Sequence, residues 1–530
     1  MSDTSRSIIK SMCYYASRKP VRMHMPGHKG RTAFSSGTNQ VETTPEWAWN
    51  LLDELRAIDM TESPGLDNLH YPTGCIRETE KRAEKIFGSS RTHLLVNGAT
   101  SGVQAALMAV RMTLGPGTVV LPRNVHRSMV TAMTMSGLEP VFVWPEYDHR
   151  LGGYLPLDVD RLRAALESAS SSSEHSSGVD GPPRAVLVIN PTYCGFARDL
   201  TKVAELVHSY GAALIVDEAH GTHFAAGNDL PPSALQAGAD LVVHGAHKTT
   251  VAFTQTAFVH VGKSTPERFP ALAAALEEAL RAVQTTSPSY ILMASLEQAI
   301  EMMEKEDGAW IDRGVATATE LTKRLSRIPG LSVVGYEAGV PVPPGLMHDP
   351  GRVLINLNGL RCTGPQAAKY LAEVHKVDPE MTGPKSILLI WTGADDEKTI
   401  DVVEAAFRDL AQEFAPEPGS KNGSGPMASA LQLMREGPRP KKVMSLREAF
   451  LSVAVPVPIE EAVGRVSADT IVIYPPGSPL VTPGEAIDAE IVEYIENAKK
   501  AGMNVLGRGI QGSNGNGNNG TMMVYCVAER

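Results

Sequence analysis

The sequence lacks a long apolar run and an excess of basic residues, and each absence excludes a class of protein. No apolar stretch approaches the roughly 20 residues of a membrane-spanning helix, so we expect no membrane partner. Lys and Arg number 49 against 59 Asp and Glu, a net charge of −10, whereas nucleic-acid binding proteins present a basic face. The first seven residues contain no apolar segment of the kind found in secretion signals.

Cysteine is also scarce, at five residues in 530, and no two cysteines form a C-x-x-C pair. This spacing predicts reduced thiols in a cytoplasmic protein, with neither a disulfide framework nor a zinc knuckle. Hydrophobic residues make up 43% and charged residues 20% of the chain, as in ordinary globular proteins. The length is sufficient for about three domains.

The order of strand and helix patterns predicts an α/β protein with five segments. We expect an N-terminal arm (1–74), a large ligand-binding domain (75–300), a small domain (301–415), a linker (416–444) and a C-terminal domain (445–530). The arm contains a Pro- and Gly-rich turn at 23–30, and 168–181 and 512–520 are polar segments with nothing to bury.

Between residues 75 and 300 apolar strands alternate with amphipathic helices, which predicts a mostly parallel sheet covered on both faces. The predicted strands are Thr118–Leu121, Pro140–Trp144, Ala185–Ile189, Ala213–Val216, Leu241–Val243 and Ala257–Val261, with a helix at Gly102–Leu114. Later patterns predict a long helix at Ala309–Arg327 and strands at Leu331–Gly335, Arg352–Asn358, Ser386–Trp391 and Thr470–Tyr474.

Two of these strands end in residues that carry chemistry. The predicted strand Ala213–Val216 is followed by Asp217-Glu-Ala-His220. The predicted strand Leu241–Val243 leads to His247-Lys248, 31 residues after Asp217. Ligands of open α/β sheets bind at the carboxyl ends of the strands. A lysine that holds an aldehyde and an aspartate that keeps a ring nitrogen protonated suit a pyridoxal phosphate site.

Three other interpretations fit the same residues. A DEAH-type helicase would need a phosphate-binding G-x-x-x-x-G-K-[ST] loop, which the sequence does not contain. A metal site at Asp217, His220 and His223 would need a helix across Gly221. A simple turn cap at Asp217 is the common role of a lone aspartate at a strand end.

Further polar groups follow neighbouring strands. The segment Gly98-Ala-Thr-Ser-Gly102 precedes a predicted helix, so it could bind a phosphate through backbone amides, or supply an ordinary N-cap from Thr100 or Ser101. His126 follows the next strand, where an imidazole can stack on a planar ring. The loop Asn190–Gly195 ends another strand on the same predicted rim.

Together these strings resemble the bacterial-type ornithine/lysine/arginine decarboxylases, pyridoxal phosphate enzymes of the aspartate-aminotransferase fold. The likeness covers most of the chain. It rests on Pro26-Gly-His-Lys-Gly30, Asp59-Met-Thr-Glu62, Gly65-Leu-Asp67, Val96-Asn-Gly-Ala-Thr-Ser101, Arg123-Asn-Val-His-Arg-Ser128, Asp217-Glu-Ala-His-Gly221, His247-Lys248, Thr285-Thr-Ser-Pro-Ser-Tyr290 and Tyr474-Pro-Pro-Gly-Ser-Pro-Leu-Val-Thr-Pro-Gly-Glu485.

The resemblance implies a fold type I large domain, a small α/β domain and an additional C-terminal α+β domain. It also implies decarboxylation of a basic amino acid to the corresponding amine, in a homodimer or dimer-based assembly. Lys248 would hold the cofactor's aldehyde, Asp217 would pair with its ring nitrogen, and His126 would stack on the ring. Thr100, Ser101 and His247 would contact the phosphate, and Ala219 would form the bottom of the cofactor pocket. Thr285 or Thr286 would reach the phosphate of the neighbouring subunit.

The sequence leaves several choices open. The proton delivered to Cα could come from Lys248, His220 or His247. A buried cation needs an acid, and the resemblance favours Glu485 for the far end of the substrate, with Asp59, Glu62 and Asp67 as alternatives. The Gly245-Ala246 pair replaces the hydroxyl residues usual in the family. The long form's N-terminal wing domain is missing, which argues against its ring-shaped assembly.

Two rival functions fit the same cofactor site or the same fold. One is another pyridoxal phosphate reaction, such as transamination, for which Arg352 or Arg361 would clamp the substrate carboxylate. The other is a catalytically silent scaffold, although a scaffold has no need of Lys248, Asp217 and His126 together.

Overall fold

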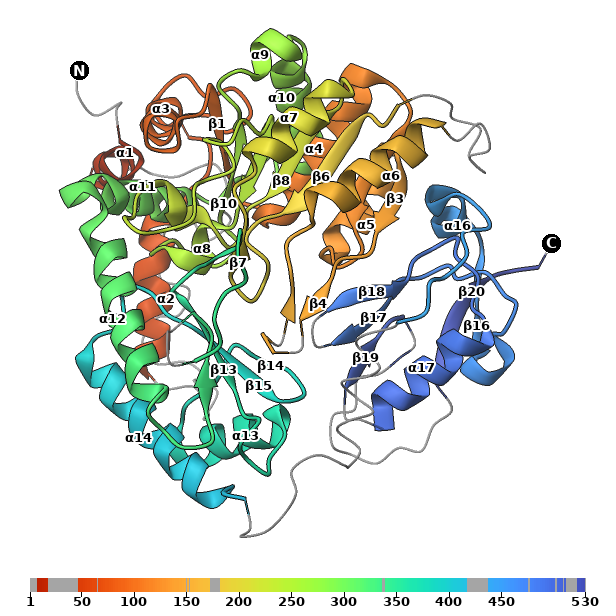
Figure 1. Ribbon diagram of the computed structural model, residues 1–530. Helices are drawn as coiled ribbons and strands as arrows, with labels where there is room; N and C mark the ends of the chain where they lie inside the picture. The colour runs from red at the N-terminus through yellow and green to blue at the C-terminus, as the bar shows by residue number, and fades with distance from the viewer. Residues whose placement is uncertain are drawn as a thin grey trace.

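A computed structural model shows three β-sheet regions that surround a common centre (Figure 1). It describes residues 7–17, 46–63, 65–148, 150–151, 153–171, 182–335, 339–416, 437–474, 477–500, 503–508, 510 and 522–529. The predicted turn at 23–30, most of the polar segment at 168–181, most of the linker and the Gly/Asn loop at 512–520 lie outside these residues.

The largest sheet has seven strands in the order β1-β10-β9-β8-β6-β2-β3. Neighbours are parallel from β9 to β3, and β10 runs antiparallel to both β1 and β9. The strands are β1 (Arg91–Leu95), β2 (Thr118–Pro122), β3 (Glu139–Val143), β6 (Ala185–Ile189), β8 (Ala213–Asp217), β9 (Leu241–His244) and β10 (Ala257–Val261).

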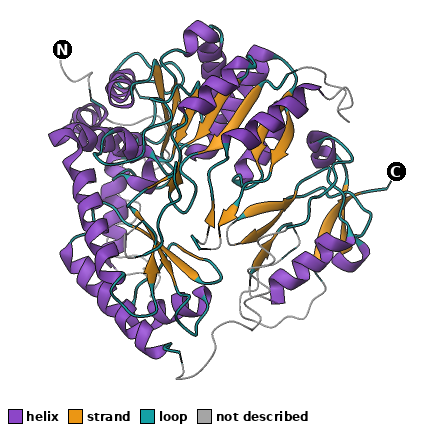
Figure 2. Ribbon diagram, in the orientation of Figure 1, coloured by secondary structure: helices purple, strands orange, loops and turns teal. Residues whose placement is uncertain are grey.

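Alternate side chains of these strands enter two separate cores, one on each face of the sheet. Leu214 and Val216 of β8 belong to one core, and Ala213 and Ile215 to the other. The first face is covered by α1 (Ile8–Ser17), α3 (Cys75–Phe87), α6 (Val159–Ser171), α7 (Thr201–Ser209) and α11 (Tyr290–Glu304). The second is covered by α4 (Gly98–Leu114), α5 (Arg127–Ser136) and α10 (Leu272–Val283). Helices therefore flank the sheet on both sides (Figure 2).

All six strands predicted for this sheet are present within a residue or two, but two details were wrong. The helix α4 begins at Gly98, so the small residues 98–101 form its first turn instead of a loop before it. Residues 168–171 belong to the end of α6, because Leu166 and Ala169 are buried against the sheet. The strand β1, at Arg91–Leu95, was not predicted.

A smaller domain follows, with a four-stranded antiparallel sheet in the order β11-β13-β15-β14. Its elements are α12 (Ala309–Leu325), β11 (Ser332–Val333), β13 (Arg352–Asn356), α13 (Gly364–Tyr370), β14 (Met381–Thr382), β15 (Ser386–Ile390) and α14 (Glu397–Glu413). The helices α12 and α14 cover the sheet around one apolar core.

The C-terminal domain has two small antiparallel sheets around its own core. Its elements are α16 (Leu446–Leu451), β16 (Ala454–Pro458), β17 (Ile471–Tyr474), β18 (Ser478–Val481), α17 (Ala489–Lys500), β19 (Asn504–Leu506) and β20 (Met523–Val527). This domain docks on the large one through Arg123, whose guanidinium binds both oxygens of Glu485 at 2.7 Å.

Shorter elements complete the described chain: α2 (Glu46–Ile58), β4 (Tyr147–Asp148), β5 (Gly153–Tyr154), β7 (Phe196–Ala197), η2 (Thr222–Ala225), α8 (Ala246–Thr249), α9 (Thr265–Arg268), η3 (Lys305–Gly308), β12 (Met347–His348), η4 (Leu371–His375) and η5 (Ile459–Glu461). Among the residues described, no helix is long and apolar enough to cross a membrane. All five cysteines are free thiols.

Candidate active site

A cleft of about 1010 Å³ opens where the three domains meet. Loops at the carboxyl ends of the large sheet form one wall, and Met381 and Gly383 of the small domain and Asp469 of the C-terminal domain line the rest. Seven of the ten predicted site residues line this cleft: Thr100, His126, Asp217, Ala219, His220, His247 and Lys248.

The parallel pairing of β8 and β9 brings the predicted acid and lysine to one edge of the sheet. Asp217 is the last residue of β8, and Lys248 lies in the short helix α8 just after β9. Asp217 Oδ1 accepts a hydrogen bond from the backbone N–H of Ala219 at 3.1 Å. The aspartate therefore does cap a turn, and its half-buried side chain also faces the cleft.

The first turn of α4 contributes backbone amides to the same cleft. Asn97 is the N-cap residue and makes no side-chain cap hydrogen bond, so the alternative of a cap from Thr100 or Ser101 is wrong. The first N–H groups of a helix have no partner within the helix and favour an anion. Thr100 is exposed and lines the cleft, whereas Ser101 is buried and its hydroxyl donates to the Gly98 carbonyl at 2.9 Å.

His126 is the N-cap residue of α5, which fixes the position of its ring. Its Nδ1 accepts a hydrogen bond from the backbone N–H of Ser128 at 3.2 Å and lies 2.8 Å from the hydroxyl of the same residue. A ring whose Nδ1 accepts a backbone N–H is deprotonated at that atom. The imidazole is open to the cleft, where a planar ligand can lie against it.

Lys248 Nζ lies 2.9 Å from His220 Nε2, and His220 Nδ1 lies 2.7 Å from a guanidinium nitrogen of Arg352. Arginine has only donors, so Nδ1 of His220 must accept and its single proton must sit on Nε2. That N–H then points at Lys248, which can accept it only as a neutral amine. The hydrogen bonds therefore require an unprotonated Lys248.

The electrostatics around these groups agree with this assignment. Burial lowers the pKa of Lys248, against the attraction of Asp217, and the positive charge of Arg352 lowers it further. Burial, Arg352 and Lys248 together hold the pKa of His220 well below its usual value. Both pKa shifts are toward the neutral form of the side chain.

His247 has a different environment from His220. Its Nδ1 donates to the backbone carbonyl of Thr256 at 2.8 Å, so in the neutral ring Nε2 carries no proton. His247 lines the cleft, so its Nε2 is the ring nitrogen available there.

Three predicted residues lie outside the cleft. Ser101 is buried in α4, and Thr286 is exposed in the loop before α11. Glu485 binds Arg123 with both oxygens and lines a separate pocket with Trp144 and Lys442. This environment does not support the prediction that Glu485 holds the substrate's distal cation, because its charge is already paired within a buried contact.

Sequence reasoning also missed several lining residues. The ring of Tyr193 lies 4.7 Å from that of His220, and Tyr193 belongs to the loop placed on the rim from the sequence. Asp469 comes from the C-terminal domain, and no local pattern marks it. No group of three or more His, Cys, Asp or Glu positioned to hold a metal ion occurs in the described part of the chain.

Comparisons with known proteins agree along the whole chain. Residues 7–337 match the family described as Orn/Lys/Arg decarboxylase, major domain, and residues 430–528 match its C-terminal domain. The chain is 32% identical to an arginine decarboxylase of Bacillus anthracis and 31% to one of Bacillus subtilis, each over 96% of both chains. It is 22% identical to a lysine decarboxylase of Hafnia alvei, over 98% of this chain and 79% of the relative.

Solved structures share the fold. Lysine decarboxylase A from Pseudomonas aeruginosa has a TM-score of 0.78 at 20% identity, covering 99% of this chain and 81% of the other. The constitutive lysine decarboxylase of Escherichia coli has a TM-score of 0.77 at 18% identity, covering 98% and 82%. These likenesses confirm the predicted fold class.

Proposed function

The chain belongs to the Orn/Lys/Arg decarboxylase family, and we propose that it is a pyridoxal phosphate-dependent decarboxylase of a basic amino acid. The observation that carries the proposal is the position of Lys248, whose Nζ lies 2.9 Å from His220 Nε2 in one cleft with Asp217 and the first turn of α4. A neutral amine can attack an aldehyde, an acid can pair with a ring nitrogen, and helix amides can hold a phosphate. The amine of Lys248, the carboxylate of Asp217 and the backbone amides of α4 therefore fit pyridoxal phosphate.

In this proposal Lys248 binds the cofactor covalently, Asp217 pairs with its ring nitrogen and His126 lies against its ring. The first turn of α4 and Thr100 hold the phosphate. Pyridoxal phosphate, when bound, supplies a ring that accepts the electron pair left on Cα as carbon dioxide departs.

The proton that replaces carbon dioxide is assigned to the Lys248–His220 pair. The two nitrogens lie 2.9 Å apart, so a proton given up by one can be supplied by the other. His247 is a weaker candidate, because its one proton is held by the Thr256 carbonyl.

The substrate's distal cation needs a carboxylate in the closed cleft. Of the described residues that line the cleft, Asp217 and Asp469 are the carboxylates. Because Asp217 is assigned to the cofactor, we assign Asp469 to the substrate. Arginine is the first substrate to test, since the relatives with 31–32% identity are named arginine decarboxylases.

Transamination is less well supported by the geometry. An aminotransferase would need a small-domain arginine in the cleft, but Arg352 is fully buried and bonded to His220. Arg361 is exposed and donates to the backbone carbonyl of Ala415.

The test supplies purified protein with pyridoxal phosphate and with arginine, lysine or ornithine labelled at the carboxyl carbon, and traps labelled carbon dioxide. We expect release from one of the three, and none from a Lys248→Ala variant that keeps its fold. Conversion of the cofactor to its amine form without carbon dioxide would instead support transamination. The absence of any cofactor absorbance in the wild type would support the scaffold alternative.

A further inference from the structure

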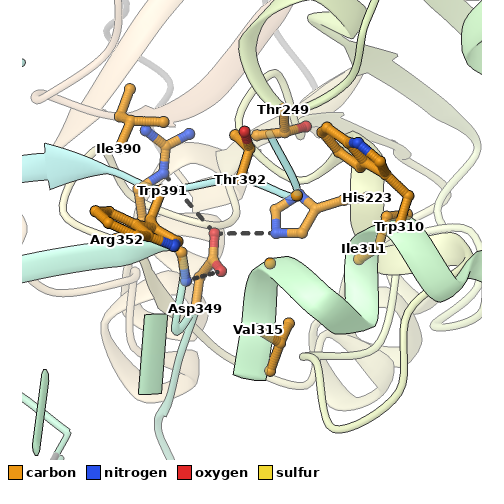
Figure 3. Close-up of a pocket in the computed structure, with 13 residues that line it drawn as sticks. His223, Thr249, Trp310, Ile311, Val315, Asp349, Arg352, Ile390, Trp391 and Thr392 are labelled. Carbon is orange, nitrogen blue, oxygen red and sulfur yellow. Dashed lines mark hydrogen bonds and ion pairs between the residues drawn. The ribbon is translucent and has the colours of Figure 1, made fainter. Parts of the chain in front are cut away.

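A buried chain of polar contacts runs from the small domain to Lys248. Figure 3 shows its first members, His223, Asp349 and Arg352. His223 Nε2 of the large domain lies 3.2 Å from Asp349 Oδ2, and Nε of Arg352 lies 3.8 Å from the same oxygen. Arg352 then donates to His220 at 2.7 Å. Asp349 and Arg352 are each at most 1% exposed, so neither interaction is screened by solvent.

Among the described residues, Asp349 is the carboxylate that forms an ion pair with Arg352. Burial opposes ionisation of Asp349, but the attraction of His223 and Arg352 outweighs it and holds the pKa of Asp349 at about 2. Asp349 is therefore ionised at neutral pH and stabilises the guanidinium beside it. Oδ1 of Asp349 accepts the backbone N–H of Gly351 at 2.9 Å, which fixes the carboxylate relative to the start of β13.

The contact depends on close packing of the two domains. The Asp349 backbone N–H donates to the Gly195 carbonyl at 2.9 Å, and β12 pairs with β7 of the large domain. A Cβ at Gly195 would come within 2.5 Å of the Arg352 Cβ, so only glycine permits this approach. Arg352 can reach His220 only while the small domain is seated on the large one.

We propose that Arg352, held by Asp349, is a positioning residue that keeps Lys248 unprotonated when the small domain is seated. The proposal rests on the proposed function, in which the Lys248 amine must attack a carbonyl through its lone pair. Arg352 acts in two ways: it fixes the proton of His220 on the nitrogen facing Lys248, and its positive charge disfavours a second cation nearby.

Other groups act on Lys248 from the elements around it. Asp217 of β8 and Glu380, next to β14, favour the protonated amine, and burial opposes it. His126, His220 and His247 are the histidines that line the cleft with Lys248. The other titratable residues that line the cleft are Arg127, Tyr147, Tyr154, Tyr193, Cys194, Asp469 and Arg508. Since two carboxylates favour protonation, loss of Arg352 shifts the balance toward the ammonium.

The experiment measures the pKa of Lys248 directly in full-length, cofactor-free protein. Trace acetylation at a series of pH values, followed by mass spectrometry of the Lys248 peptide, gives the pH midpoint of amine reactivity. We expect a wild-type midpoint below the roughly 10.4 of a free lysine. Arg352→Met should raise it by about one pH unit or more, and Arg352→Lys, which keeps a cationic donor, should restore most of the difference.

Arg361→Met is the matched control, because it removes a small-domain arginine that contacts backbone carbonyls, and its midpoint should equal the wild-type value. A folded Arg352→Met protein with an unchanged midpoint would overturn the proposal. Because no cofactor or substrate is present, this result stands whether or not the protein decarboxylates an amino acid.

Arg352→Met could fail to fold, so a second measurement uses the wild-type protein. With ¹⁵N-labelled histidine, and His220→Gln to assign the signal, the ring shifts of His220 should show an unprotonated Nδ1 and a protonated Nε2 at neutral pH. The opposite tautomer would refute the proposal that Arg352 fixes the proton of His220 on the nitrogen facing Lys248.

Discussion

Single residues of the cleft have separable roles, and Asp217 gives the simplest test. The change Asp217→Asn keeps the size of the side chain and removes the charge proposed to pair with the ring nitrogen. We expect pyridoxal phosphate to bind still and kcat to fall by about a hundredfold or more, since a preorganised charge at the reacting group is lost. Steady-state kinetics and the cofactor's absorbance spectrum check this. Near-normal turnover would show that Asp217 is only a turn cap.

The contacts move the proposed substrate acid from Glu485 to Asp469. The Arg123–Glu485 pair is 3% and 8% exposed, and Arg123 also donates to the Pro479 and Leu480 carbonyls. Breaking such a pair leaves a buried cation, at a cost of about 3–5 kcal/mol. We expect Glu485→Gln to lower the melting temperature, and Asp469→Asn to raise KM for the basic amino acid while the melting temperature stays near the wild-type value. A raised KM in Glu485→Gln, with a normal KM in Asp469→Asn, would instead support Glu485 as the acid that binds the substrate.

At the level of elements, the position of α4 depends on Gly102. A Cβ there would lie 2.8 Å from Leu95 and 2.9 Å from Val243, side chains of β1 and β9. Gly102→Ala should push the helix from the sheet and cost about 1–3 kcal/mol. Its first turn would move with it, so affinity for pyridoxal phosphate should fall while affinity for pyridoxal, which lacks the phosphate, should not. Titrations with both compounds check this, and Met112→Ala, at an exposed position of α4, is the control.

A second element-level feature is a buried chain of side chains across four strands. Glu218 accepts a hydrogen bond from His244 Nε2 at 2.7 Å, His244 Nδ1 lies 3.0 Å from His260 Nε2, and His260 Nδ1 lies 2.8 Å from the Thr92 hydroxyl. Both ring nitrogens of His260 therefore have buried partners.

For the whole molecule these histidines predict a loss of stability in mild acid. Burial holds the pKa of His260 and His220 well below the usual 6.5. Below pH 6.5 the unfolded chain binds protons that the native protein does not. The free energy of unfolding therefore decreases as the pH decreases. The slope is up to about 1.4 kcal/mol per pH unit for each such histidine. Calorimetric melting temperatures between pH 7.5 and 5 should fall, and His260→Gln should make the decrease shallower. An equal decrease in the variant would exclude His260 as a cause.

The assembly of the molecule is predicted from Thr286, which is exposed and does not line the cleft of its own subunit. We expect a homodimer in which Thr286 reaches the phosphate site of the neighbouring subunit. Mixing inactive Lys248→Ala and Thr286→Arg proteins should then restore activity, up to about one quarter of the wild-type value, because some sites receive both intact parts. Dimers that exchange subunits and stay inactive would argue against shared sites.

The sequence by itself determined six of the seven strands of the large sheet, because buried strands are continuous apolar runs that need no knowledge of their neighbours. The strand β1 was missed because it begins with Arg91, Thr92 and His93. It also placed Asp217 and Lys248 at strand ends, and strand ends on one edge meet in any such fold. The start of α4 was misjudged because Gly98 and Gly102 disfavour a helix locally, whereas packing against Leu95 and Val243 favours one there.

Only the tertiary structure decided what the remaining groups do. Arg352 and Lys248 are 104 residues apart, and Arg123 and Glu485 are 362 residues apart. Contacts between residues so far apart in the sequence depend on how separate domains pack, and no local sequence pattern indicates that packing. The same holds for the protonation of Lys248: the sequence supplied an amine, and the arginine and histidine brought beside it by folding determine whether that amine carries a charge.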